Sequence, residues 1–188
     1  DRLIELGLPA HCDAISIHPY RHRTTPEAGD LVGDLTHISD FSAQHGKRLP
    51  LWITELCWVT NLPHGNTERR AARMLGRAVP LALSTGFVER ITWFRFSDPG
   101  TDRFYLEHNC SLIRHDLTPK AEYFAYRTCA LMLDGSEPVP VSGPRPDTGV
   151  WSRVFRRGAK YVLALWCEER SELCAVEVWA KEVKRVDL

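Results

Sequence analysis

The sequence predicts an α/β fold in which parallel strands alternate with helices, followed by a small antiparallel β domain. Three observations indicate this fold. Strand-like and helix-like stretches alternate three times within residues 13–135, and the strand-like stretches recur about every 38 residues. A stretch rich in Pro and Gly follows at 138–149, and β-rich runs occupy the rest of the chain. The alternating order is typical of a parallel sheet with crossover helices.

The first strand is predicted at residues 13–18. The stretch "CDAISIHPY" alternates Ile15 and Ile17 with small residues and breaks at Pro19. Apolar residues at helical spacing then predict a helix over 30–46, which ends in a glycine.

Two further strand and helix pairs follow in the same order. The stretch "RLPLWITEL" predicts a strand at 50–55, and a helix over 66–86 begins with a capping residue and ends in a glycine. A third strand is predicted at 89–95. The last helix is predicted over 118–135, with a proline near its first turn.

The three units predict the C-terminal (βα) units of a (β/α)8 TIM barrel. Eight units of this length would form a barrel somewhat above the typical ~250 residues, and three cannot close one. We therefore expect the C-terminal part of a barrel domain at 1–137, a linker at 138–149 and part of a β-sandwich at 150–188. The chain starts without an initiator Met, so we interpret it as a fragment, and a secreted or cytoplasmic location stays open.

Composition excludes several function classes. Lys and Arg total 24 and Asp and Glu total 24, so no basic surface indicates nucleic acid or a membrane as a partner. No cofactor motif and no obligate protein partner are evident. His18 and His22 flank a short loop with no third ligand, so no metal site is predicted. The six cysteines form no C-x-x-C pair, which favours scattered thiols or a single disulfide.

Chemistry-bearing residues follow the ends of all three predicted strands. His18 and Tyr20 follow the first strand, Glu55 ends the second, and Trp93 lies on the third. Because the carboxyl ends of parallel strands meet at one edge, we expect these side chains to lie together. Flat aromatic faces, hydrogen-bond donors and a carboxylate are the groups that bind and cleave sugars.

Strand alternation gives an expectation for the two faces of the second strand. Leu51, Ile53 and Glu55 should share one face, and Trp52 and Thr54 the other. We expect Ile53 to fill the barrel interior, Glu55 to lie at its mouth, and Trp52 to pack outward under the helices.

These motifs resemble the C-terminal half of a clan A glycoside hydrolase barrel, similar to families 5 and 39. "WITE" is similar to the W-x-T-E motif of that clan, which implies that Glu55 is the retaining nucleophile. His18 and Tyr20 match a His-x-Tyr motif, whose Tyr bonds the nucleophile and whose His contacts sugar. Trp93 matches the tryptophan that forms the floor of the central subsite. The run "SLIRHDLTPKAEYFAY" also resembles the clan, with Ser111 in place of the usual glycine.

The resemblance implies a retaining glycoside hydrolase acting on a β-linked polysaccharide or oligosaccharide. The acid/base of the clan is a Glu that follows Asn, and no Asn-Glu pair occurs here, so we expect that residue to be missing from this fragment. A non-catalytic carbohydrate-binding or structural barrel homologue is the alternative. Trp58 is interpreted either as a sugar-stacking platform or as a packing aromatic.

Other candidate residues have ordinary structural interpretations. The loop after the third strand holds three carboxylates that we expect to be solvated. Three arginines of the second helix should lie on its solvent-exposed face. Tryptophans of the β-rich runs should pack in a core. These residues are Asp98, Asp102 and Glu107; Arg69, Arg70 and Arg73; and Trp151, Trp166 and Trp179.

Overall fold

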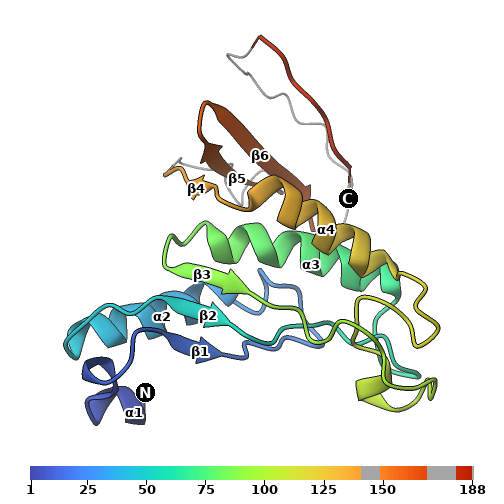
Figure 1. Cartoon of the computed structure of the whole chain (residues 1–188), viewed down its shortest axis with the longest axis horizontal. Coiled ribbons are helices and arrows are strands. Elements are labelled where there is room, and N and C mark those ends of the chain that lie inside the picture. The colour runs from blue at the N-terminus through green and yellow to red at the C-terminus, as the bar shows by residue number, and fades with distance from the viewer. Residues whose placement is uncertain (141–148, 169–180, 188) are drawn as a thin grey trace.

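The computed structural model describes residues 1–140, 149–168 and 181–187. Its elements alternate in the predicted order (Figure 1). After a short helix α1 (Arg2–Glu5) and a 3-10 turn η1 (Leu8–Ala10) come β1 (Ile15–Ile17), α2 (Leu31–Gln44), β2 (Leu51–Ile53), α3 (Glu68–Leu83), β3 (Val88–Ile91), the 3-10 turn η2 (Leu106–His108), α4 (Ala121–Leu133), β4 (Glu137–Pro138), β5 (Val150–Arg157) and β6 (Lys160–Cys167).

The first three strands form one parallel sheet in the order β1-β2-β3. Ile17 pairs with Ile53, and Ile53 pairs with Ile91, so the carboxyl ends of all three strands lie at one edge. The predicted parallel pairing is confirmed. The strands are shorter than predicted, because the backbone leaves the ladder before His18, Glu55 and Trp93.

The predicted assignment of the two sheet faces is wrong. Leu51 and Ile53 are fully buried and belong to the same core cluster as Leu75 and Ala78 of α3, so they face the helices. Trp52 lies on the opposite face, where Ser16 and Arg90 are exposed, with the Arg90 guanidinium 4.6 Å from its ring centroid. The apolar side of α3 requires an apolar partner, and alternate strand residues supply it.

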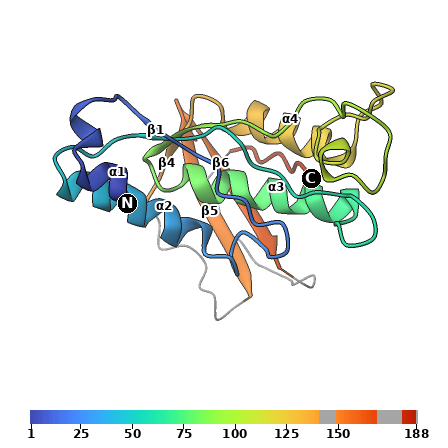
Figure 2. The ribbon, with the colours of Figure 1, turned by 90° about the horizontal axis from the view of Figure 1, so that it is seen from below.

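The helices form a layer against that apolar face. Figure 2 shows α2 and α3 beside each other, and α4 packs along α3 (Figure 1). The side chain of Thr67 caps α3 by accepting a hydrogen bond from the Arg70 amide, and Asp30 caps α2 in the same way through Gly33. No helix among the described residues is long and apolar enough to cross a membrane.

The last three strands form an antiparallel sheet in the order β4-β5-β6. Phe155 of β5 is fully buried in the common core, and Arg153 donates to the Ser84 hydroxyl at 2.8 Å. The sheet therefore packs on the helical layer. Its assignment to a β-sandwich and the domain boundaries stay predictions, and Trp179 and Cys174 lie outside the described residues.

Candidate active site

Glu55 and Tyr20 meet at the carboxyl edge of the parallel sheet. The Tyr20 hydroxyl donates to Glu55 Oε2 at 2.7 Å, the hydrogen bond that the family resemblance implied. Because β2 ends at Ile53, strict alternation no longer governs Glu55. Its side chain is 33% exposed and is therefore open to a ligand.

His18 lies on the other side of the same carboxylate. Its Nδ1 is 3.5 Å from Glu55 Oε2, and its Nε2 is 3.0 Å from the Thr54 hydroxyl. The Thr54 hydroxyl also lies 2.6 Å from that of Ser16. The imidazole is 46% exposed, so the carboxylate and the imidazole present adjacent polar groups at one edge.

Burial, followed by the hydrogen bond to Glu55, raises the pKa of Tyr20 above its ordinary value of 10.0. The phenol therefore stays protonated and remains a donor to the carboxylate. The imidazole of His22 stacks on the Tyr20 ring with centroids 4.9 Å apart, and burial lowers the pKa of His22. A neutral aromatic pair thus flanks Glu55.

The two tryptophans near this edge are buried, which favours packing over sugar stacking for Trp58 and leaves little of the Trp93 ring open for the subsite floor that the resemblance implied. Trp58 is 1% exposed, stacks on Trp93 at 6.2 Å and donates its indole N–H to the Thr24 carbonyl. Its ring offers no open face, so packing is its role in this structure. Trp93 is 5% exposed and donates to the Cys110 carbonyl at 3.1 Å.

The loop of residues 19–30, which we call the Tyr20 loop, joins β1 to α2 and is held at several points. Arg21 donates to the carbonyls of Pro19 at 2.7 Å and Gly29 at 2.8 Å, and pairs with Asp34. Asn66 donates to the His22 carbonyl at 3.2 Å. A cavity of about 470 Å³ opens on this loop, lined by residues 20–24, Gly29 and Asp34.

Comparison with known proteins identifies a family for this chain. Residues 8–123, more than half of the chain, match the family model described as glycosyl hydrolase catalytic core. The chain belongs to this family. No match was found among curated proteins.

Solved glycoside hydrolases share the fold of this family member. A family 39 glycoside hydrolase from Bacteroides cellulosilyticus WH2 is 22% identical, with a TM-score of 0.76 over 89% of this chain and 36% of its own. GH5_18 from Streptomyces cattleya, solved with GlcNAc, is 20% identical, with a TM-score of 0.52 over 71% of this chain and 35% of its own.

A mutant of the xylanase Xyn10A from Cellvibrio japonicus is 19% identical, with a TM-score of 0.50 over 68% of this chain and 43% of its own. These structures are TIM-barrel hydrolases, so the parallel sheet and its helices have the fold of part of such a barrel. The chain spans about a third of the length of the first two.

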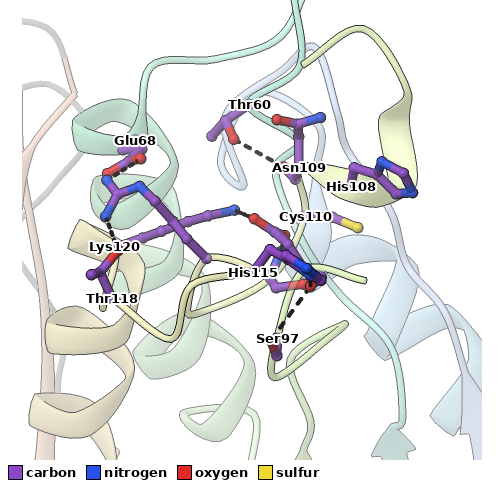
Figure 3. A network of polar contacts seen from close by, with 12 residues as sticks. Thr60, Glu68, Ser97, His108, Asn109, Cys110, His115, Thr118 and Lys120 are labelled. Carbon is purple, nitrogen blue, oxygen red and sulfur yellow. Dashed lines mark hydrogen bonds and ion pairs between the residues drawn. The ribbon is translucent and has the colours of Figure 1, made fainter. Parts of the chain in front are cut away.

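A buried ion pair that the sequence did not predict joins the loop after β3 to the start of α4. Lys120 Nζ is 2.6 Å from Asp98 Oδ2, and both side chains are buried. Figure 3 shows Lys120 reaching from the start of α4 toward the loops that carry Ser97 and Cys110. The prediction that Asp98 is solvated is wrong. Lys120 and the Ser111 amide, which donates to Asp98 at 3.2 Å, together take the place of water around the buried carboxylate.

Glu122, two positions after Lys120, is a second buried carboxyl of this chain. It is 2% exposed, and its Oε2 has no hydrogen-bond partner among the described residues. Burial raises the pKa of Glu122 to about 8. It lies in the first turn of α4, inside the protein.

The remaining candidates have simpler surroundings. Arg69, Arg70 and Arg73 are exposed, as predicted, and Asp102 and Glu107 stay in the loop after β3. Within residues 1–140, 149–168 and 181–187, no three His, Cys, Asp or Glu side chains are placed to hold a metal ion.

Proposed function

We propose that this chain contributes the nucleophile to a retaining glycoside hydrolase that cleaves β-linked polysaccharides or oligosaccharides. The observation that carries the proposal is the position of the Glu55 carboxylate at the carboxyl edge of the sheet, where it accepts a hydrogen bond from the Tyr20 hydroxyl at 2.7 Å. Active sites of (β/α)8 enzymes form at this edge. Membership of the glycosyl hydrolase catalytic core family supports the reaction class.

Each residue has a distinct part in the proposed reaction. Glu55 Oε attacks the anomeric carbon, forms a glycosyl ester and is released when water hydrolyses that ester. Tyr20 orients the attacking carboxylate and stabilises its charge by donating a hydrogen bond. His18, 3.5 Å from the same oxygen and half exposed, contacts a sugar hydroxyl.

The reaction also needs a second carboxyl about 5–5.5 Å from the nucleophile to protonate the leaving oxygen. No Asn-Glu pair stands in the 188 residues. We propose that this acid/base belongs to a part of the barrel outside this chain, since the chain spans about a third of the family 39 structure. The 188-residue chain alone is then expected to be inactive, and a complete barrel that contains it active.

The test is hydrolysis of activated aryl β-glycosides by a complete barrel that contains this chain. Glu55→Gln should abolish turnover, because the amide has the same shape but does not form the ester. Glu107→Gln, a carboxylate in the loop after β3 that pairs with Arg95, is the matched control and should retain full activity. A 2-fluoro aryl glycoside should label the Glu55 peptide in the unsubstituted protein.

Normal turnover by Glu55→Gln, or a label on another residue, would overturn the assignment. Sugar binding without turnover or labelling in the complete barrel would instead favour the alternative, a non-catalytic carbohydrate-binding homologue.

A further inference from the structure

The Tyr20 loop is held from outside the parallel sheet by the antiparallel sheet. Glu27, seven positions after Tyr20, places its carboxylate between α3 and β6. Arg77 of α3 pairs with both of its oxygens, with Nε donating to Oε1 at 2.8 Å. The indole N–H of Trp166 in β6 donates to the same Oε1 at 2.7 Å.

This attachment is buried. The side chain of Glu27 is 2% exposed and that of Arg77 is 6% exposed. A buried carboxylate requires its charge and lone pairs to be satisfied. The position of Glu27 is therefore set jointly by one helix and by a strand about 140 residues later in the chain.

A side chain directly after β6, that of Glu168, reaches the same loop. The Thr25 hydroxyl donates to Glu168 Oε2 at 3.3 Å, and Arg77 lies 3.6 Å from the same oxygen. The other oxygen of Glu168 accepts from the indole N–H of Trp151 at 3.0 Å. Residues 25–27 of the loop are thus anchored at two neighbouring points.

Arg21 connects this anchored part to Tyr20. Its guanidinium donates to the carbonyl of Pro19 at one end of the loop and to that of Gly29 at the other. The Arg21 side chain is 7% exposed, so these bonds do not compete with bulk water. A displacement near Glu27 is therefore transmitted to the backbone next to Tyr20.

We propose that the antiparallel sheet sets the conformation of the Tyr20 loop, with Trp166 as a positioning residue for the hydrogen bond from Tyr20 to Glu55. The same contact sets the shape of the cavity that the loop lines. Only the consequence for sugar cleavage rests on the proposed function. The placement of Tyr20 can be measured without a substrate.

The experiment uses the 188-residue chain labelled with 3-fluorotyrosine. Its five tyrosines give five ¹⁹F resonances, and Tyr20→Phe assigns the one of interest. Trp166→Phe keeps the ring and removes the indole N–H. It should shift or split the Tyr20 resonance and speed amide exchange in residues 21–30 by about tenfold, because a hydrogen bond to a carboxylate is lost.

Trp151→Phe is the matched control. Trp151 and Trp166 stack on each other with centroids 6.3 Å apart, and both donate an indole N–H to a carboxylate. Only the Trp166 bond goes to the loop itself, so Trp151→Phe should leave the Tyr20 resonance and the exchange of residues 21–30 as in the unsubstituted chain.

An unmoved Tyr20 resonance in Trp166→Phe would overturn the proposal, and so would equal shifts in both variants, which would indicate a packing effect. If Trp166→Phe does not fold, Glu168→Ala decides, since it removes the link to Thr25 and keeps the hydrogen bond from the Ala28 amide to the Thr25 hydroxyl. A shift of Tyr20 in that variant supports the proposal, and none overturns it. Labelling of Glu55 by a fluorinated sugar is a separate measurement, so failure of the proposed function is distinguishable.

Discussion

The hydroxyl of Tyr20 and the carboxylate of Glu55 lie 2.7 Å apart although 35 positions separate them in the sequence. Two neighbouring parallel strands bring them together, since Ile17 and Ile53 are paired immediately before them. The contact makes the phenol a donor to a group with a formal charge, which is the stronger class of hydrogen bond. The first prediction follows from it.

Tyr20→Phe should lower kcat/KM of a complete barrel that contains this chain by about 10- to 100-fold. A hydrogen bond to a charged group contributes about 1.5–3 kcal/mol, and each 1.36 kcal/mol is a factor of ten. The ring and its stacking on His22 are kept. Steady-state kinetics on an aryl β-glycoside measures the effect. Tyr105→Phe, which changes an exposed side chain, should leave the rate unchanged; a wild-type rate for Tyr20→Phe would contradict the orienting role.

Lys120→Met should destabilise the chain by about 3–5 kcal/mol, because it leaves the buried Asp98 carboxylate without its counter-ion. The double variant Lys120→Met, Asp98→Asn should recover part of that loss. Urea denaturation followed by tryptophan fluorescence measures both. Arg2→Met breaks an exposed pair with Glu5 and should cost at most about 1 kcal/mol. An equal loss of stability in Lys120→Met and Arg2→Met would show that the Asp98 pair is not buried in solution.

Glu122→Gln should remove a pH dependence of stability. The pKa of Glu122 is about 8 in the folded chain and near its ordinary 4.5 when unfolded. The folded state thus holds a proton that the unfolded state releases. The contribution of Glu122 to the free energy of unfolding is therefore fully present below about pH 4.5. It falls as pH rises toward 8, by at most about 1.4 kcal/mol per pH unit.

Urea midpoints between pH 5 and 8 test this dependence. The glutamine variant is neutral throughout, so its midpoint should fall less with pH and lie above that of the unsubstituted chain at pH 8. Lys120, Glu68 and Asp98 also act on Glu122, and all three remain in the variant. Glu137→Gln, at an exposed carboxylate, should keep the original slope. An unchanged slope in Glu122→Gln would contradict the assignment.

Ile53→Ala should cost about 2–5 kcal/mol, since it opens a cavity against α3, whereas Ser16→Ala on the opposite face should cost less than about 1 kcal/mol. Denaturant midpoints of the two variants compare the faces directly. Similar losses would mean that both faces are packed in solution.

Local pattern predicted the order, direction and approximate bounds of the main elements, because strand alternation, capping residues and glycine stops act over a few positions. It also predicted that His18, Tyr20 and Glu55 lie together, since topology alone brings strand ends to one edge. It placed Ile53 on the wrong face, because alternation separates two faces without saying which one the helices cover.

Side-chain partners distant in the sequence were not predicted. Arg77 is surrounded by apolar helix residues, and its partner Glu27 lies 50 positions earlier, so no spacing links them. The pairing of Lys120 with Asp98 and the burial of Trp58 depend in the same way on how loops fold over the sheet. An arginine within an otherwise apolar stretch, as in "MLGRAVPLAL", is the signal that could have indicated a buried ion pair.

The separation of the two faces of β1 and β2 has a consequence for engineering. Ile17 and Ile53 carry the packing, whereas Ser16 and Thr54 carry the polar groups next to His18. Libraries confined to Ser16, Thr54 and His18 therefore vary the polar groups at this edge at little risk to folding. Changes of these polar groups and gains in thermal tolerance can be sought in separate rounds and then combined in one gene.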